Sequence, residues 1–222
     1  TLSLHDAVPI FSVVLADGYW TIPQKVFETS GIMSLGIGLT VDPHGGVHSV
    51  WGVREQVDYS DQKVIYYTRL DGDDRTIQDV IVTETALNSI AVQAGNFGLL
   101  TAWYGGNYTY VPFSSIYDVK FWMKNLVEIP MGYPNSFIVK DPKNNVWGAW
   151  GERDGVYIAL FDEINQIWAN KIQVSLSEQP NSMSDAVRLS ISNEGIIHVV
   201  WAQYRLPSGW PPLGLYYSNS KD

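Results

Sequence analysis

The stretch Gly46-Val47-His48-Ser49-Val50-Trp51 decides the fold, because near-copies of it recur down the chain. The copies are Leu99-Leu100-Thr101-Ala102-Trp103, Val146-Trp147-Gly148-Ala149-Trp150 and Ile197-His198-Val199-Val200-Trp201. Their tryptophans are separated by 52, 47 and 51 residues. Self-similarity with a period of about 40–50 residues is typical of solenoids and propellers.

Each copy lies in a unit that can be written as four strands, A to D, with the tryptophan ending strand B. A turn rich in Gly, Asn, Asp and Pro separates strand A from strand B, because these residues suit turn backbone angles. The predicted strands A are 36–41, 89–93, 136–140 and 187–192, and the predicted strands C are 64–69, 118–123, 156–161 and 213–218. Strand D is clearest at 20–26 and 168–174, which share the spacing Trp-x5-Val. Four strands per repeated unit predict an all-β propeller of about four blades.

The repeats divide residues 11–222 into blades near 30–82, 83–130, 131–174 and 175–222, with strand D of a further or closing blade at 20–26. The first strand C-like run is 11–16, and the last repeat stops at strand C. Two alternatives follow: the N-terminal strand completes the last blade of a small ring, or the chain is a slice of a propeller with six or more blades. Residues 1–10 resemble adapter read-through in a metagenomic assembly, so we expect a non-native tail there.

The repeated tryptophans are expected to pack between neighbouring blades, since one blade cannot bury both of its faces. His48 and His198 lie three residues before a tryptophan, so strand alternation places them on the opposite face. We therefore interpret them as packing residues and not as metal ligands.

Composition excludes several function classes. The net charge of −9 argues against a nucleic-acid partner, which requires a basic face. There is no cysteine, so no disulfide or thiolate metal site can form. No apolar run is long enough for a membrane-spanning helix, and no phosphate or dinucleotide motif indicates a cofactor.

The arrangement of turns and aromatic residues resembles the sialidase-like propellers with Asp-box-type (BNR) repeats. The residues that carry the resemblance are Gly46, His48, Trp51, Tyr66, Tyr67, Asp17, Gly18, Trp20 and Pro23, echoed by Gly195, His198, Trp201, Tyr216 and Tyr217. The Asp-box positions at 17–20 and 162–168 are shortened or degenerate, and the Arg-Ile-Pro motif of sialidases is absent. The resemblance implies a glycan partner and an extracellular or cell-surface location, with the functional face formed by the B–C loops and D–A connections.

The B–C loops are predicted at 52–63, 104–117, 151–155 and 202–213, and long loops often carry function. An arginine follows the tryptophan by three or four residues in three repeats: Arg54, Arg153 and Arg205. A radial arrangement predicts that they share one face of the disc, where guanidinium groups suit the carboxylate of an acidic sugar. The alternative is that each arginine pairs with a neighbouring Glu55, Glu152 or Asp154.

Hydrolysis of a glycoside generally needs two carboxylates, or a tyrosine with a glutamate in sialidases. The candidates on these loops are Glu55, Asp58, Asp61, Glu152, Asp154 and Tyr204, and candidate sugar-stacking rings are Tyr104, Tyr108, Tyr110, Tyr204 and Trp210. For the rings, the alternative is packing within the loops.

Three functions stay open at this point. The first is a carbohydrate-directed, sialidase-type exo-glycosidase or part of one. The second is a non-catalytic glycan- or protein-binding module of a secreted or surface protein. The third is a purely structural repeat domain.

Overall fold

The computed structural model describes most of the chain in segments. They are residues 8–12, 15–16, 19–20, 24–29, 33–57, 60–70, 78–83, 90–103, 107–116, 126–128, 137–152, 154–176, 182–205 and 212–221. Side chains are described in a smaller part, which begins at residue 36.

Four antiparallel sheets follow one another along the chain, and we name them blades 1 to 4. Blade 1 contains β5 (Met33–Val41), β6 (Val47–Val57), β7 (Ser60–Arg69) and β8 (Gln78–Thr83). Blade 2 contains β9 (Ile90–Ala94), β10 (Gly98–Trp103), β11 (Asn107–Pro112) and β12 (Leu126–Glu128), with a short 3-10 helix, η1 (Phe113–Ser115), after β11. Blade 3 contains β13 (Phe137–Lys140), β14 (Val146–Glu152), β15 (Gly155–Asp162) and β16 (Ile167–Leu176). Blade 4 contains β17 (Ser182–Ile191), β18 (Ile197–Arg205) and β19 (Pro212–Asn219).

The turns between the first and second strands repeat the same backbone geometry. In blades 1, 3 and 4 a backbone N–H donates back across the turn, from Gly45 to Asp42, from Asn144 to Asp141, and from Gly195 to Ser192. Gly45, Asn144 and Gly195 have φ of 87°, 62° and 82°. Glycine and asparagine tolerate this left-handed backbone best, which is why the turn composition marks the repeat.

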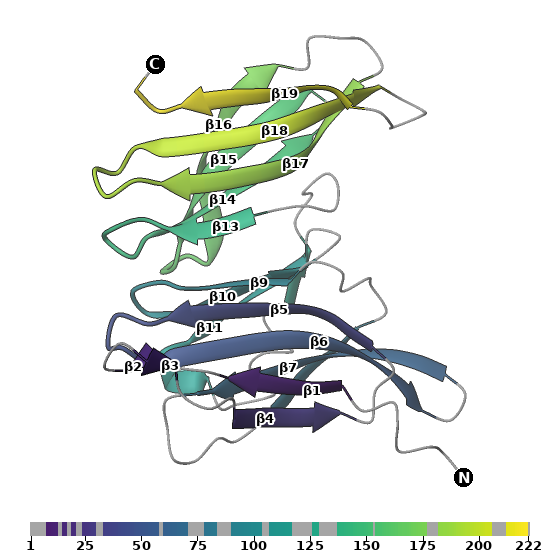
Figure 1. The fold of residues 1–222 in the computed structure, drawn as a ribbon. Helices are drawn as coiled ribbons and strands as arrows, with labels where there is room; N and C mark the ends of the chain where they lie inside the picture. Colours follow the sequence, from purple (N-terminus) through teal and green to yellow (C-terminus); the bar gives the residue numbers. More distant parts are fainter. Residues whose placement is uncertain are drawn as a thin grey trace.

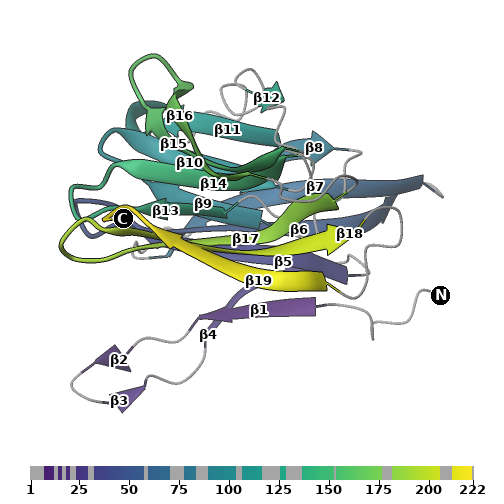
Figure 2. The same ribbon diagram turned by 90° about the horizontal axis from the view of Figure 1, so that it is seen from above.

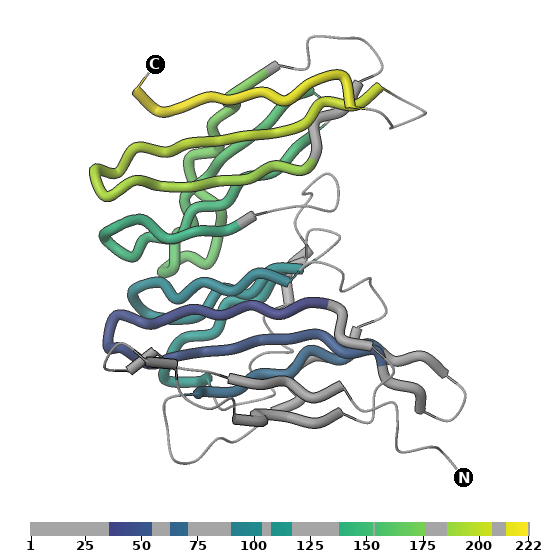
Figure 3. Tube along the Cα trace, in the orientation of Figure 1, coloured from purple at the N-terminus to yellow at the C-terminus, as the bar shows by residue number. Residues whose placement is uncertain are grey.

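The blades are arranged as an arc, with blade 1 at the bottom and blade 4 at the top of Figure 1. Figure 3 traces the same path from purple at the bottom to yellow at the top. The first strands of neighbouring blades contact one another along the inside of the arc. Side chains link these strands: Thr40 of β5 accepts a hydrogen bond from the Ala94 N–H at 3.1 Å, and Gln93 of β9 donates to the Ile138 carbonyl at 3.3 Å.

Three of the four hydrophobic clusters among the described residues lie between neighbouring blades. The fourth joins Trp150 to Tyr157, Ala159 and Trp168 within blade 3, so the expected packing between blades is wrong for Trp150. The interface of blades 1 and 2 joins Val50, Ile65 and Tyr67 to Ile90, Val92, Ala94 and Trp103. The interface of blades 2 and 3 joins Leu100, Ala102, Tyr108 and Tyr110 to Ile138, Val146 and Phe161. The interface of blades 3 and 4 joins Ala149, Val156 and Ile158 to Val187, Leu189, Val199 and Trp201.

The predicted all-β propeller of about four blades is confirmed. Each repeated tryptophan lies in the second strand of its blade and is 6% exposed or less. His48 faces away from Trp51, as strand alternation predicts, and packs against Tyr67.

The predicted B–C loops were wrong in length, because the strands continue through most of them. β6 and β7 pair as far as Val57 and Ser60, so Arg54 and Glu55 lie on a strand. The third strand of blade 2 is Asn107–Pro112. The prediction placed this strand at 118–123, and those residues lie outside the described part of the chain. The alternating residues of β11 pair directly with β10, which leaves only residues 104–106 between the two strands.

Residues 8–29 form two small antiparallel pairs. β1 (Val8–Ser12) pairs with β4 (Gln24–Thr29), and β2 (Leu15–Ala16) pairs with β3 (Tyr19–Trp20). They stand at the blade 1 end of the arc, apart from β19 in Figure 1, and Figure 2 shows them beside the main body. Val8, Pro9 and Ile10 of the expected tail are paired in β1, and the non-native origin of residues 1–10 stays a prediction, as do the domain boundaries.

Candidate functional site

In each blade the second and third strands are joined on the side away from the turn between the first and second strands. We call this side of each blade its B–C end. At this end of blade 1, Arg54 pairs with Met33 of β5 on one side and with Lys63 of β7 on the other. In blade 4, Arg205 pairs with Ser182 of β17. The B–C end therefore carries Arg54 and Arg205, two of the predicted candidates.

The predicted arginine cluster is described in part. Arg54 is half-buried and Arg205 is exposed, whereas Arg153 lies outside the described residues. Arg205 is one position farther from its tryptophan than Arg54 is, so alternation points the two toward opposite faces of their sheets. Their convergence on one carboxylate stays a prediction.

A polar and aromatic cluster lies at the B–C end of blade 3, where β14 turns into β15. The Trp150 Nε1–H donates to Glu152 Oε1 at 2.7 Å, and the Lys171 Nζ of β16 lies 2.6 Å from the same oxygen. The side chains of Lys171 and Glu152 are 45% and 24% exposed. Glu152 is thus held by two partners and still reaches solvent.

Tyr157 adds a second carboxylate contact to this cluster. Its hydroxyl donates to Asp154 Oδ2 at 2.8 Å, and Lys171 Nζ lies 3.8 Å from the centre of its ring. Burial, the hydrogen bond to Asp154 and the charges of Asp154 and Glu152 raise the pKa of Tyr157 to about 12. The phenol therefore keeps its proton at neutral pH and acts as a donor.

We define the blade 3 cluster as Trp150, Glu152, Asp154, Tyr157 and Lys171. The sequence pattern predicted Glu152 and Asp154 as site residues, but it did not predict Trp150, Tyr157 or Lys171. Lys171 could be recognised only once β16 was known to pair with β15, since it is 19 residues from Glu152. Two carboxylates, an ammonium group and a phenol, brought together from β14, β15, β16 and the turn at Asp154, can bind hydroxyl groups and transfer protons.

Several other candidates lie elsewhere or outside the described residues. Tyr108 and Tyr110 are 4% and 3% exposed and pack on Phe161 between blades 2 and 3, so we assign them no ligand role. Tyr204 is half-buried and pairs with Met183 and Pro212. Tyr104 and Trp210, together with the side chain of Glu55, lie outside the described part.

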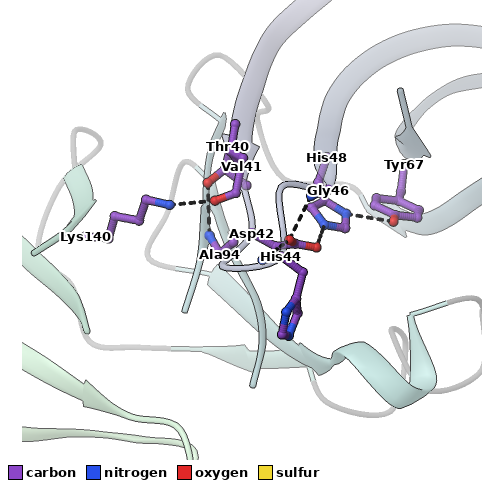
Figure 4. A network of polar contacts seen from close by, with 9 residues as sticks. All are labelled: Thr40, Val41, Asp42, His44, Gly46, His48, Tyr67, Ala94 and Lys140. Atoms are coloured by element: carbon purple, nitrogen blue, oxygen red, sulfur yellow. Dashed lines mark hydrogen bonds and ion pairs between the residues drawn. The ribbon is translucent and has the colours of Figure 1, made fainter. Parts of the chain in front are cut away.

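A buried polar network occupies the opposite end of blade 1, at the turn between β5 and β6 (Figure 4). The Asp42 carboxylate accepts hydrogen bonds from the backbone N–H of His44 at 2.7 Å and of Gly46 at 2.8 Å. His48 Nε2 lies 2.9 Å from Asp42 Oδ2, and because a carboxylate only accepts, this nitrogen carries the proton. His48 Nδ1 lies 3.0 Å from the Tyr67 hydroxyl.

This network stabilises a turn. Burial by itself raises the pKa of Asp42, but the hydrogen bonds from His48, Gly46 and His44 outweigh it, and the pKa lies below its usual range. Asp42 and His48 are 8% and 2% exposed, so they offer no surface to a ligand. Blade 4 repeats part of the arrangement, with His198 Nδ1 at 2.8 Å from the Tyr217 hydroxyl.

Two further findings concern the described residues. They contain no group of three or more His, Asp or Glu side chains placed to hold a metal ion. Among them there is also no helix with the length and apolar character that crossing a membrane requires.

Comparison with known proteins supports the fold. The structure of the Penicillium chrysogenum α-L-arabinanase in complex with arabinobiose is similar, with a TM-score of 0.50 and 12% sequence identity. The match covers 98% of this chain and 67% of the arabinanase chain. No family model and no curated protein matches the sequence. The likeness agrees with the predicted propeller, and it does not single out the sialidase-like family.

Proposed function

We propose that this chain is a carbohydrate-directed propeller that binds a glycan at the B–C end of blade 3. The observation that carries the proposal is the blade 3 cluster, which presents two carboxylates and an ammonium group next to Trp150 and Tyr157. Sugar hydroxyls donate to carboxylates and accept from ammonium groups. Trp150 and Tyr157 are 3% and 8% exposed, so their part is to hold Glu152 and Asp154 in place. The similar fold of an arabinanase that holds arabinobiose supports a sugar as the ligand class.

Glycoside hydrolysis is the second candidate function, and the pair Glu152 and Asp154 favours it. Two carboxyl groups that flank a glycosidic bond can serve as acid and as base or nucleophile. Glu152 pairs with Lys171 in this structure, and Asp154 accepts from Tyr157. A sialidase-type reaction would also use the predicted arginines at this end, and secretion or surface display would suit either function.

Calorimetric titration with arabinobiose and with sialyllactose tests the binding proposal. We expect heat of binding with at least one of these sugars, and its loss in Glu152→Gln, because the amide cannot pair with Lys171. The matched control is Glu194→Gln, in the turn between β17 and β18, where Glu194 is 77% exposed and 3.6 Å from Lys221 Nζ. Binding that survives in Glu152→Gln, or no binding of either sugar, contradicts the proposed site.

Release of aryl alcohol from aryl arabinosides and aryl sialosides then separates the two functions. Turnover that is lost in both Glu152→Gln and Asp154→Asn supports hydrolysis. Binding without turnover supports a non-catalytic glycan-binding module. An aryl arabinoside and an aryl sialoside differ in charge, so the preferred substrate also shows whether an acidic sugar is recognised.

A further inference from the structure

One face of β5 carries three exposed aliphatic side chains, whereas the equivalent side chains of β9 are buried. Ile37, Leu39 and Val41 are 56%, 61% and 44% exposed. Counted from the turn that follows each strand, they correspond to Ile90, Val92 and Ala94 of β9, which are buried against blade 1 at 9%, 2% and 0% exposure. The face of β5 therefore has the composition of an interface between blades.

Blade 4 shows the complementary case at the other end of the arc. Val200, Leu215 and Tyr217 are 40%, 76% and 57% exposed. Their equivalents by register in blade 1 are Val50, Ile65 and Tyr67, which are all 0% exposed because blade 2 covers them. The pair of His198 and Tyr217 has the same ring stacking as His48 and Tyr67, with centroids 6.0 Å apart in both.

Two sheets remain outside the blades, β1 with β4 and β2 with β3, and each has two strands. In blades 1 to 3 the third strand bonds to the second strand on one side and to the fourth strand on the other. Among the described residues β1 bonds to β4 alone. The predicted third and fourth strands, 11–16 and 20–26, overlap β1 and β4 in part and include β2 and β3. The β1–β4 pair therefore matches the third and fourth strands of a blade in pairing and in sequence order, and it stands at the blade 1 end of the arc (Figure 1).

We propose that one β-hairpin covers both uncovered faces by supplying the first two strands of the blade whose last two strands are β1 and β4. The hairpin pairs its second strand antiparallel with the edge of β1 opposite β4, which bonds to no other strand among the described residues. Aliphatic residues on one of its faces pack on Ile37, Leu39 and Val41, and those on its other face pack on Val200, Leu215 and Tyr217. The occupant is therefore a two-stranded segment that is apolar on both faces, like β17 and β18.

The internal interfaces explain why a hairpin fits and a complete sheet does not. A complete blade brings its own third strand, which would compete with β1 for the same place in the sheet. A hairpin adds only the two strands that lie nearest the inside of the arc. Exposed apolar patches of this kind mark surfaces that bind a partner, and their burial is favourable in proportion to the area removed from water.

A peptide with the sequence of residues 182–205, which form β17 and β18, is the probe for this proposal. It is labelled and titrated into the full chain, and binding is followed by fluorescence anisotropy and by hydrogen exchange. We expect one peptide per chain, with slower exchange at 37–41 and at 213–217. Leu39→Asp and Leu215→Asp each weaken binding at least tenfold, whereas Ile164→Asp, at an 82% exposed turn position, does not. Circular dichroism confirms that all three variants are folded.

Three results overturn the proposal. The first is no binding of the peptide. The second is binding that both aspartate variants leave unchanged, which would place the peptide elsewhere, for example by exchange into blade 4. The third is self-association of the full chain that Leu39→Asp and Leu215→Asp abolish and that the peptide does not displace, because a second copy is then the occupant.

Discussion

At the scale of single residues, the repeated tryptophans have two roles, packing between blades and support of the candidate site. Trp103 is 3% exposed in the interface of blades 1 and 2, and Trp201 is 6% exposed in that of blades 3 and 4. Trp150 instead packs on Tyr157, Ala159 and Trp168, and its indole N–H donates to Glu152. One repeated residue therefore serves packing in two blades and also supports the candidate site in a third.

Replacement of Trp103 by alanine tests the packing between blades. Removing a large aromatic side chain from a core costs about 3–5 kcal/mol of unfolding free energy, because the cavity is not refilled. We expect Trp103→Ala to fall in this range in urea denaturation. Ile164→Ala, at a position that is 82% exposed, is the control and is expected to change little. A loss below about 1 kcal/mol for Trp103→Ala would show that the tryptophan is not a core residue.

Asp42 makes the stability depend on acid pH. Its pKa is lowered in the folded state, so it stabilises the fold above the unfolded-state value of about 3.9, and this contribution is lost as pH falls through the folded-state pKa. We expect Asp42→Asn to lower the free energy of unfolding at pH 7 and to flatten its decline below pH 4 (about the unfolded pKa). Thermal unfolding across acid pH measures both effects. A decline equal to that of the unchanged chain would contradict the assignment.

Tyr157 makes the stability depend on alkaline pH, with the opposite sign. Its pKa is raised to about 12, so its contribution is complete below the unfolded value of about 10 and is lost as pH rises toward 12. Tyr157→Phe is expected to remove this part of the alkaline decline. Tyr217→Phe, at a 57% exposed tyrosine in blade 4, is the control. An unchanged alkaline profile in Tyr157→Phe would mean that the phenol does not depend on Asp154.

At the scale of elements, the turns tie neighbouring blades together. Glu163, in the turn between β15 and β16, accepts hydrogen bonds from the backbone N–H of Asn96 at 2.8 Å and of Phe97 at 3.0 Å. The same carboxylate accepts from the Tyr110 hydroxyl at 2.8 Å. Its partners belong to blade 2 and are more than 50 residues away, so no local sequence pattern could have indicated this contact.

A double-mutant cycle on Glu163→Gln and Tyr110→Phe measures this link between blades. Hydrogen bonds to a charged group contribute about 1.5–3 kcal/mol, and contacting residues show coupling of about 0.5–3 kcal/mol. We expect each single variant to be destabilised and the double variant to be less destabilised than the sum. If the losses of unfolding free energy were additive within experimental error, the contact between Glu163 and Tyr110 would not stabilise the interface of blades 2 and 3.

Sequence reasoning predicted the strands where the repeat is regular and failed where the repeat changes length. The turns at Gly45, Asn144 and Gly195 were recognised because positive φ restricts the residue type. The third strand of blade 2 was misplaced because β10 ends at Trp103, whereas β6 continues past Trp51 to Val57. The alternation of Tyr108, Thr109 and Tyr110 was an available signal, since aromatic and β-branched residues favour strands.

At the scale of the whole molecule, a buried polar network and a partly exposed polar cluster lie at opposite ends of their blades. The network of Asp42, His48 and Tyr67 is buried at the turn end of blade 1, where it fixes the backbone. The blade 3 cluster lies at the B–C end, where Glu152 and Lys171 reach solvent. The sequence could name Glu152 and Asp154 by their place after a repeated tryptophan. It could not place Lys171, because that contact depends on the register of β15 with β16.

Hydrogen exchange with and without bound sugar tests the central claim most directly, because it shows where on the arc a glycan binds. The chain is measured alone and then with saturating arabinobiose or sialyllactose, followed peptide by peptide. We predict slower exchange in the segment 150–157 and no change in the turns around Asp42 and Ser192. Protection confined to those turns, or no protection anywhere with either sugar, would contradict a glycan site at the B–C end of blade 3.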